Sequence, residues 1–414
     1  MPGPARRIPV NKPAPTSQPA FHGYRVLDFT QVVAGPFAAQ LLGASGADVI
    51  KVEGHGGDQL RRIFKTTSQH ESESSGAFAA VNRGKQSIAL NLKDPKGRDA
   101  ALRIAAQCDV FVENFRPGVI KRLGLDYETV RQLRPDVIYC SISGFGQSGP
   151  LAPQSAYDGG IQAASGMMST TGHPETGPVR AGYLPVDTPT GLLAAFAIAS
   201  ALLRRERTGL GQYLDVAMLD AALLLQMPAV SMYLQDGTIN GLRGNTSPAR
   251  SPLANTFKAS DGFLAVSVVT PVHGKAALTC LGLPETLWDD YLNHPPGSPR
   301  VRQIDGQIHQ AFETRTVTAW ESELRSKGLS VEPVNQVPGG VELARRQGRP
   351  VLGGQLSASA DSHISYGGAY AADNDGPRFA GTTPEIGEHG ELILRQFGFT
   401  DQEIAEILGG TMAD

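Results

Sequence analysis

The chain has 414 residues, more than one hydrophobic core usually supports, so we expect two domains or one large domain with an insertion. Charged residues make up 19% of the sequence and the formal net charge is only −3, which argues against a nucleic-acid-binding or membrane-binding surface. The cysteines, Cys108, Cys140 and Cys280, are odd in number and lie in apolar segments, which is typical of reduced thiols in a cytoplasmic protein and not of a disulfide framework.

The N-terminal half of the chain alternates between predicted strands and helices. Residues 1–22 are rich in proline and lack the apolar stretch of a secretory signal, so we expect a disordered tail. Residues 34–36 read as a turn, and residues 66–76 as a polar, serine-rich loop. Strands are predicted at residues 24–29, 47–53, 109–114 and 136–142, with helices at 37–45, 94–107 and about 117–133. This alternation predicts an α/β fold with a doubly wound parallel sheet.

Parallel sheets of this kind bind ligands beyond the carboxyl ends of their strands. Those ends lead here into residues 30–33, 54–58, 114–118 and 143–149, where we expect the functional site. Gly144, Gly146 and Gly149 match a dinucleotide-binding fingerprint, but prolines follow where a phosphate-binding helix would have to begin. We therefore predict a tight, ligand-facing turn at this place and no nicotinamide or flavin cofactor.

The C-terminal half is less regular. The apolar run at 191–203 is too short to span a membrane and predicts a core helix, followed by a strand at 212–217 and a helix at 219–225. Thr400 and Glu403 have the spacing of a capping box at the start of a last helix. The predicted division is a tail at 1–22, a large domain at 23–228, a smaller α+β domain at 229–345 and a C-terminal segment at 346–414.

Few common catalytic signatures are present. None of the nine histidines is spaced from another histidine or a cysteine as metal ligands usually are, so no metal site is predicted. The sequence has neither the glycine-flanked serine of the α/β-hydrolases nor a phosphate-binding loop. Judged only from its neighbouring residues in the sequence, Asp187 is interpreted as a helix N-cap. On the same basis Lys85 and Lys93 are interpreted as charges at strand ends, and Arg116 and Arg122 as solvated helix residues.

Four segments in combination resemble the class III CoA-transferase family of the CaiB/BaiF type, which includes formyl-CoA, carnitine and glutarate CoA-transferases. These segments are residues 26–36, 46–53, 112–118 and 142–150, and the resemblance extends from Gly23 to Leu408. It implies a Rossmann-like large domain built from both ends of the chain, a smaller domain and an interlocked homodimer. It also implies that coenzyme A and acyl-CoA are substrates, that a carboxylic acid is the second substrate, and that no cofactor is needed.

The resemblance also implies a CoA site. Arginine and lysine side chains would meet the phosphates, and the backbone of glycine- and proline-rich turns would approach the pantetheine. Several relatives carry an arginine that packs on the adenine, where this chain has Gly54 and His55, so His55, Arg61 or Arg62 would have to replace it. The residues carried over by motif are Val33, Ala34, Leu90, Asn91, Leu92, Lys93, Asn114, Phe115, Arg116 and Arg122.

Asp187 aligns with the catalytic carboxylate of the family, which implies that it is a covalent nucleophile. Its attack on an acyl-CoA would form a mixed anhydride that keeps at least the energy of the thioester, whereas a serine ester would be too stable to return CoA. An aspartyl-CoA thioester is the expected second intermediate. We expect the helix that follows Asp187 to keep its carboxylate ionised.

Two other functions are compatible with the resemblance. Related 2-methylacyl-CoA racemases use a histidine base in a Gly-His-Asp segment, whereas this chain has Tyr157 and Asp158 there, and a tyrosine is a poor base for an α-proton. A non-catalytic CoA-binding subunit of a hetero-oligomer is the second alternative. The glycine-rich loop of oxalate-using relatives is not evident between Tyr233 and Ser251, and Arg180 is a candidate partner for the distal carboxylate of a dicarboxylic acid.

Overall fold

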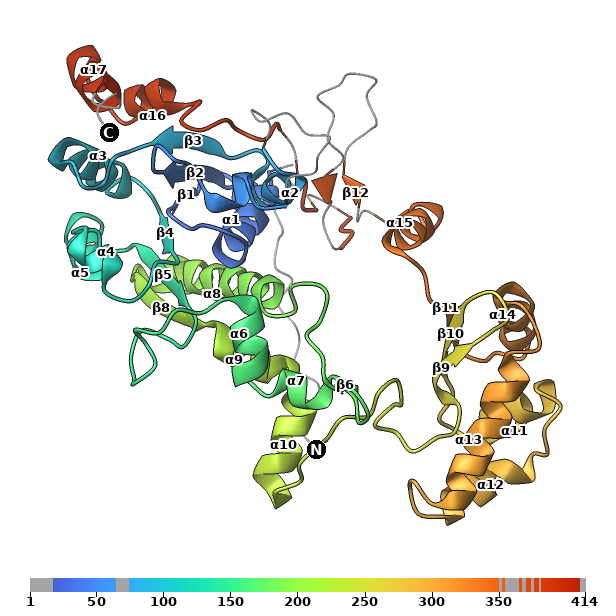
Figure 1. Ribbon diagram of the computed structural model, residues 1–414. Helices are drawn as coiled ribbons and strands as arrows, with labels where there is room; N and C mark the ends of the chain where they lie inside the picture. Colours follow the sequence, from blue (N-terminus) through green and yellow to red (C-terminus); the bar gives the residue numbers. More distant parts are fainter. Residues whose placement is uncertain are drawn as a thin grey trace, which may run out of the picture. The chain divides into compact units, whose positions relative to one another are not determined.

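The computed structural model describes residues 18–64, 74–349, 352–353, 365–366, 370–373, 376–379 and 381–409 (Figure 1). Most of the predicted tail and of the predicted serine-rich loop lies outside these residues. The chain divides into two compact units. The first comprises Met1–Ser165, Tyr183–Met227 and Ala344–Asp414, and the second Gly166–Gly182 and Pro228–Leu343.

A six-stranded sheet forms the centre of the first unit, and all of its strand pairs are parallel. Its strands are short and mostly apolar, as expected for a sheet that is covered on both faces. In spatial order they are β3 (Gln86–Ala89), β2 (Asp48–Glu53), β1 (Arg25–Asp28), β4 (Val110–Glu113), β5 (Ile138–Ser143) and β8 (Gln212–Ala217). The predicted α/β fold with a parallel central sheet is confirmed. The order reverses between β1 and β4, which marks the topological switch point.

One face of the sheet is covered by α1 (Ala34–Ala44) and α8 (Asp187–Thr208). The two helices approach closely at Gly191, because a Cβ there would lie 2.6 Å from the carbonyl oxygen of Ala34. The turn predicted at residues 34–36 is wrong: these residues form the first turn of α1. Pro36 is tolerated there because N–H groups in the first turn of a helix have no intrahelical partner.

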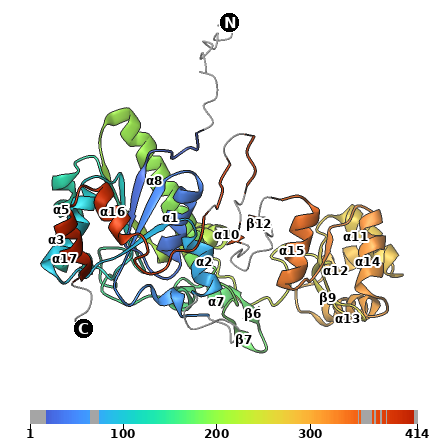
Figure 2. The same cartoon turned by 90° about the horizontal axis from the view of Figure 1, so that it is seen from above.

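The other face carries helices from both ends of the sequence (Figure 2). They are α3 (Pro95–Ala105), α5 (Tyr127–Leu133), α16 (Gly390–Gln396) and α17 (Asp401–Gly409). Ile393 and Leu394 are fully buried in the same cluster as Leu27, so the C-terminal segment completes this core. The predicted capping box is confirmed, since the Glu403 N–H donates to the Thr400 hydroxyl and the Thr400 N–H donates to the Glu403 carboxylate.

Five shorter helical elements complete the first unit. The single helix expected near 117–133 is two helices, because Gly124 adopts a left-handed conformation (φ 68°) between them. The elements are the 3₁₀ helix η1 (Gln59–Arg61), α2 (Gly76–Asn82), α4 (Val119–Arg122), α6 (Asp158–Ala164) and α9 (Met218–Leu225). None of the described helices is long and apolar enough to cross a membrane.

The second unit has an antiparallel sheet of β9 (Ala254–Lys258), β10 (Phe263–Ser267) and β11 (Val331–Pro333). Trp288, Phe312 and Trp320 fill its core, which is enclosed by α11 (Pro271–Cys280), α12 (Thr286–Asn293), α13 (Pro299–Phe312) and α14 (Val317–Ser326).

Residues 166–182, which the sequence analysis assigned to the large domain, group with the second unit. They contain α7 (Met167–Thr170) and the hairpin of β6 (Gly172–His173) and β7 (Gly177–Pro178). The N–H of Gly244 donates to the carbonyl of Gly172 at 2.8 Å, which ties the hairpin to the second unit.

The remaining elements are α10 (Met227–Asp236), α15 (Val337–Arg346), β12 (Leu352–Gly353) and β13 (Ser365–Tyr366).

Candidate active site

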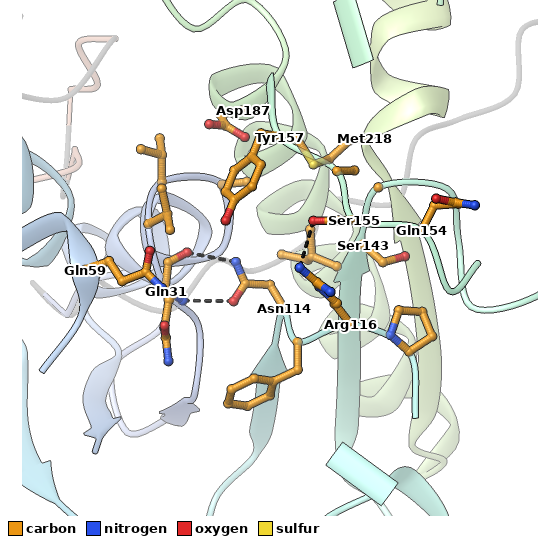
Figure 3. A pocket seen from close by; sticks show the side chains of 18 residues that line it. Gln31, Gln59, Asn114, Arg116, Ser143, Gln154, Ser155, Tyr157, Asp187 and Met218 are labelled. Carbon is orange, nitrogen blue, oxygen red and sulfur yellow. Dashed lines mark hydrogen bonds between the residues drawn. The ribbon is translucent and has the colours of Figure 1, made fainter. Parts of the chain in front are cut away.

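A pocket of about 280 Å³ lies at the carboxyl ends of β1, β4 and β5, at the topological switch point (Figure 3). Its wall consists of residues 31–34 after β1, 114–117 after β4, 142–144 at the end of β5 and 154–157 before α6, together with Gln59, Asp187 and Met218. Three of the four predicted loops therefore contribute directly to one pocket. All of the lining residues belong to the first unit.

The ten predicted CoA-site residues divide into two groups. Val33, Ala34, Asn114, Phe115 and Arg116 line the pocket. The other five do not: Leu90 is buried in the core of the sheet, Asn91 accepts the N–H of Lys93, Leu92 packs against the core, and Arg122 is an exposed residue of α4. The pocket thus gathers the residues of the first and third motifs, while Leu90–Lys93 and Arg122 lie outside it.

Asn114 joins the two loops that flank the switch point. Its side-chain amide donates to the carbonyl of Gln31 and accepts the N–H of the same residue, both at 2.8 Å (Figure 3). Arg116 donates to the hydroxyl of Ser155 at 2.9 Å, which connects the loop after β4 to the segment before α6. No carboxylate among the described residues pairs with Arg116, so its positive charge is available to an anionic ligand.

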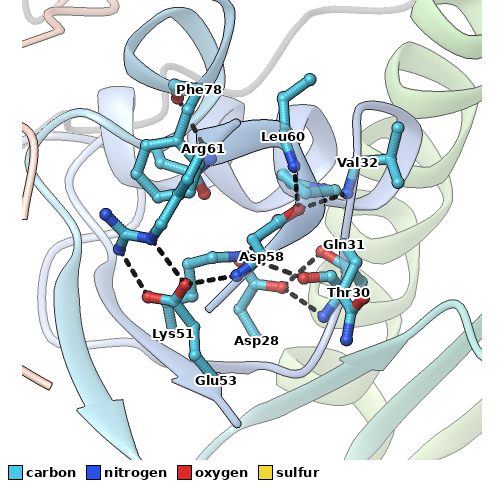
Figure 4. A network of polar contacts seen from close by, with 12 residues as sticks. Asp28, Thr30, Gln31, Val32, Lys51, Glu53, Asp58, Leu60, Arg61 and Phe78 are labelled. Carbon is cyan, nitrogen blue, oxygen red and sulfur yellow. Dashed lines mark hydrogen bonds and ion pairs between the residues drawn. The ribbon is translucent and has the colours of Figure 1, made fainter. Parts of the chain in front are cut away.

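The loop after β1 is held by a buried carboxylate that the sequence analysis missed (Figure 4). Val32 has a left-handed backbone (φ 68°), which costs of order 1–3 kcal/mol for a β-branched residue. Its N–H donates to Asp58 at 3.1 Å, and the Asp58 carboxylate also accepts the N–H of Leu60 and pairs with the fully buried Lys51 at 3.0 Å. The charged residues that interrupt the apolar strand at 48–53 are the signal that would have indicated this network.

The roles that the sequence suggested for two basic residues, Arg61 and Lys85, are wrong. Arg61 cannot serve the adenine, because it is buried, makes a bidentate ion pair with Glu53 and lies 3.9 Å from the ring centre of Phe78 (Figure 4). Burial raises the pKa of Glu53, but the charges of Arg61 and Lys51 outweigh it and the pKa is lowered overall. Lys85 is not a solvated strand-end charge, since it is buried and pairs with Asp28 at 2.8 Å.

His55 and Arg62 remain candidates for the adenine. His55 is exposed, and Arg62 donates to the carbonyl of Gly56. Among the described residues, no cluster of histidine, cysteine, aspartate or glutamate side chains has a geometry that would hold a metal ion.

Asp187 is the first residue of α8 and its side chain lies in the pocket wall, near Tyr157 (Figure 3). The interpretation of Asp187 as an N-cap is wrong, because Val186 occupies the N-cap position and Asp187 is already the first helical residue. The carboxylate of Asp158 supplies the capping hydrogen bonds: it accepts the N–H of Val186 at 2.9 Å and the N–H of Asp187 at 3.0 Å. Asp158 comes from α6, which packs against α9 beside α8.

The pKa of Asp187 is raised to about 6, first by burial and second by the negative charge of Asp158. This direction is opposite to the one expected from a helix N-terminus acting on an uncapped carboxylate. At neutral pH the group is still mostly ionised, and it is more basic than an ordinary aspartate. Asp187 is therefore a carboxylate that accepts none of the described N–H groups of its own helix, in a pocket lined by one arginine and four amide side chains.

The model of CoA-transferase family III matches residues 21–389. The chain belongs to this family. It is 36% identical to the succinyl-CoA:glutarate CoA-transferase of Mus musculus, over 78% of this chain and 73% of that protein. It is 34% identical to the acetyl-CoA:oxalate CoA-transferase of Acetobacter aceti over 91% of this chain and 95% of that protein.

Solved structures of CaiB/BaiF proteins are also similar to this family III chain. The crystal structure of a CAIB/BAIF family protein from Brucella suis matches with a TM-score of 0.82 at 30% identity, over 92% of this chain and 100% of that one. The predicted family is therefore confirmed. Because these relatives are named as CoA-transferases, the racemase alternative is not favoured.

Proposed function

We propose that this family III protein transfers CoA from an acyl-CoA thioester to a free carboxylic acid, with Asp187 as the covalent nucleophile. The observation that carries the proposal is the Asp187 carboxylate, which lines the pocket and receives no hydrogen bond from the α8 N-terminus. A carboxylate free of backbone donors can present a lone pair to a thioester carbonyl.

The proposed reaction has four displacements. The Asp187 carboxylate attacks the thioester carbonyl, the C–S bond breaks, and CoA thiolate leaves a mixed anhydride behind. The thiolate then attacks the Asp187 carbonyl of that anhydride, which releases the donor acid and forms an aspartyl-CoA thioester. The acceptor carboxylate attacks this thioester to form a second anhydride, and the thiolate finally attacks the acceptor's carbonyl. The new acyl-CoA leaves and Asp187 is restored as a carboxylate.

The pocket supplies groups for these steps. Asn114 and Arg116 lie in its wall, where an amide and a guanidinium stabilise the negative charge that develops on the carbonyl oxygens. We propose that Val33, Ala34 and Phe115 contact the pantetheine arm and that Lys93 and Arg122, both exposed, bind the phosphates of CoA at the entrance. Leu90, Asn91 and Leu92 would then shape the segment that presents Lys93.

We infer that the protein acts as a homodimer, interlocked as the family resemblance implies. Exposed apolar side chains on α8 and α9 support this inference, since Phe196 is 71% exposed and Leu192, Leu203, Leu224 and Leu225 are each about half exposed. Large apolar side chains gathered on neighbouring helices mark protein contacts.

For the acids, we propose a dicarboxylic substrate; Arg180, a residue of the second unit, stays a prediction from the sequence as the partner of its distal carboxylate. The relatives named for succinyl-CoA, glutarate and oxalate support a dicarboxylate class, and Arg180 is an exposed cation. The two carboxylates of the acid then have different roles: one reacts at Asp187 and the other is recognised electrostatically.

The decisive experiment incubates the native chain, Asp187→Ala and Asp187→Asn with a panel of acyl-CoAs and mono- and dicarboxylic acids, and follows CoA exchange by mass spectrometry. We expect exchange by the native chain, a loss of at least 1,000-fold in both variants, and hydroxylamine-sensitive labelling of Asp187 in the native chain. Full exchange by Asp187→Ala would overturn the nucleophile assignment. Epimerisation of a 2-methylacyl-CoA without exchange, or exchange only after a partner subunit is added, would overturn the proposed activity of the isolated chain.

A further inference from the structure

The N-terminus of α8 is capped by a residue from a different element. Asp158, the first residue of α6, is only 3% exposed. One of its carboxylate oxygens accepts the N–H groups of both Val186 and Asp187, and the other accepts the side-chain amide of Gln162 at 2.6 Å. Both oxygens of Asp158 are therefore engaged within the protein.

This arrangement changes what Asp187 can do. An aspartate at the start of a helix normally accepts N–H groups from the first turn, which stabilises its ionised form and makes it a weaker base. A carboxylate bound in this way would have to give up its hydrogen bonds before it attacked a carbonyl. Asp158 accepts the N–H groups of residues 186 and 187, those of Thr188 and Thr190 donate to backbone carbonyls, and residue 189 is a proline without an N–H. No described N–H of the first turn is therefore left for the carboxylate of Asp187, which lines the pocket.

We propose that Asp158 is a positioning residue for Asp187: its carboxylate holds the N–H groups of Val186 and Asp187, which fixes the direction in which the Asp187 side chain leaves α8 and keeps its carboxylate in the pocket wall, available for nucleophilic attack. This inference rests on the proposed role of Asp187. It assigns Asp158 a role through Asp187 and not through contact with substrate, since Asp158 is buried and does not line the pocket.

The charge of Asp158 acts in the same direction as its hydrogen bonds. A second carboxylate close by disfavours ionisation of Asp187, and this effect adds to that of burial in raising its pKa. The other titratable groups on the surrounding elements of the first unit are Tyr157 before α6, Tyr183 before α8 and the exposed Asp220 on α9, and α1 carries none. Arg116 is the cation among the described residues that line the pocket.

The test compares Asp158→Asn and Asp158→Ala with the native chain in CoA exchange from pH 5 to 8. Asparagine keeps an oxygen that accepts the two N–H groups but removes the charge, whereas alanine removes both. For the native chain we expect a rate that rises with a midpoint near pH 6, as Asp187 ionises. For Asp158→Asn the midpoint moves to lower pH. For Asp158→Ala kcat falls at least about tenfold at pH 7, with KM for acyl-CoA within about twofold of the native value.

Asp126→Ala is the matched control for Asp158→Ala. Asp126 also caps a helix, accepting the N–H of Thr129 at the start of α5, but it does not line the pocket. We expect the midpoint and kcat of this variant to equal those of the native chain, so a change seen only in the Asp158 variants is not a general effect of losing a cap. Thermal unfolding of each variant shows whether it is folded, and amide exchange in the native chain carries the test if Asp158→Ala is not.

A measurement on the native chain tests the geometry without any variant. The N–H groups of Val186 and Asp187 should exchange slowly with deuterium because Asp158 accepts them, and fast exchange would overturn the proposal. A folded Asp158→Ala variant with the native kcat at pH 7 would also overturn it. The proposed function fails separately, because in that case Asp187→Ala retains exchange. Loss of exchange in Asp187→Ala together with a native kcat in Asp158→Ala overturns the role of Asp158 alone.

Discussion

The side-chain amide of Asn114 and the backbone of Gln31 form a pair of hydrogen bonds, each 2.8 Å long, that joins the loops after β4 and β1. These loops come from the two strands between which the order of the sheet reverses. One side chain therefore holds together the two loops that line the candidate pocket.

Replacing Asn114 by alanine should loosen the contact between these loops. The loss of two partly buried hydrogen bonds should lower the free energy of unfolding by about 1–3 kcal/mol and raise KM for acyl-CoA several-fold. Chemical denaturation and initial-rate kinetics measure the two effects. The exposed Asn335 in the second unit serves as the control, and Asn335→Ala should change neither quantity. An Asn114→Ala variant with native stability and KM would contradict the bridging role.

Replacing Asp58 by asparagine should destabilise the protein strongly, by about 3–5 kcal/mol, because it leaves the buried ammonium group of Lys51 without its ion-pair partner. Glu128→Gln provides the comparison. The ion pair of Glu128 with Arg131 is more than half exposed, so its loss should cost no more than about 0.5 kcal/mol. Equal losses for the two variants in urea unfolding would show that the Lys51–Asp58 pair is not a structural element of the loop.

The buried carboxyl group of Glu113 should make the free energy of unfolding depend on pH. Burial raises its pKa to about 7, more than the hydrogen bonds from Ser141 and the Phe115 N–H lower it. Its contribution to folding is therefore fully present below about pH 4.5, where the unfolded group is also protonated, and is lost as the pH rises through 7. The loss should be on the order of 3 kcal/mol by pH 8.

Glu113→Gln should remove this dependence. Its free energy of unfolding, measured in urea at pH 5 and at pH 8, should fall less over that interval than that of the native chain. The remaining fall comes from other groups, including Asp187, whose pKa is also raised. If the variant and the native chain lost the same amount of stability, Glu113 would not be the group responsible.

Arg116→Gln should weaken acyl-CoA binding. The guanidinium of Arg116 lines the pocket without a carboxylate partner among the described residues, so its removal takes away a positive charge that meets the substrate. We expect KM for acyl-CoA to rise about tenfold, and the increase to shrink at high salt. Arg131→Gln, on the exposed side of α5, is the matched control. A native KM in Arg116→Gln at low salt would exclude direct binding.

Phe196→Glu should dissociate the proposed dimer, because it places a charge in the middle of the exposed apolar surface of α8. Light scattering after size-exclusion chromatography measures the mass. The control Glu206→Gln, near the end of the same helix, should leave the mass unchanged. A Phe196→Glu protein with the native mass would place the subunit contact elsewhere.

Much of the fold was predictable because it depends on local patterns. The strands observed at β1, β2, β4, β5 and β8 lie within two residues of their predicted positions, since apolar runs bounded by turn residues indicate buried parallel strands. The helices were predicted less well at their ends, where proline can continue a first turn, as at Pro36, and where one left-handed glycine, Gly124, divides a helix.

The candidate site was predictable only in part. Asn114 and Arg116 stand in a segment that indicates the family, and Asp187 aligns with the family's catalytic carboxylate, so the sequence alone determined that these residues are expected in the pocket. It did not reveal that Lys51, Asp58 and Arg61 are buried together, because their partners are set by how the loop after β2 folds back on β1.

Asp187 shows what the sequence determined by itself and what only the tertiary structure decided. The sequence by itself determined that a carboxylate stands at the start of a long helix, and through its motifs that the chain belongs to CoA-transferase family III. Only the tertiary structure decided which carboxylate caps that helix, because the N–H groups of α8 are taken by Asp158, 29 residues earlier in the chain. A hydrogen bond depends on distance in space, and packing of α6 beside α8 brings Asp158 within 3.0 Å of a group it does not neighbour in sequence.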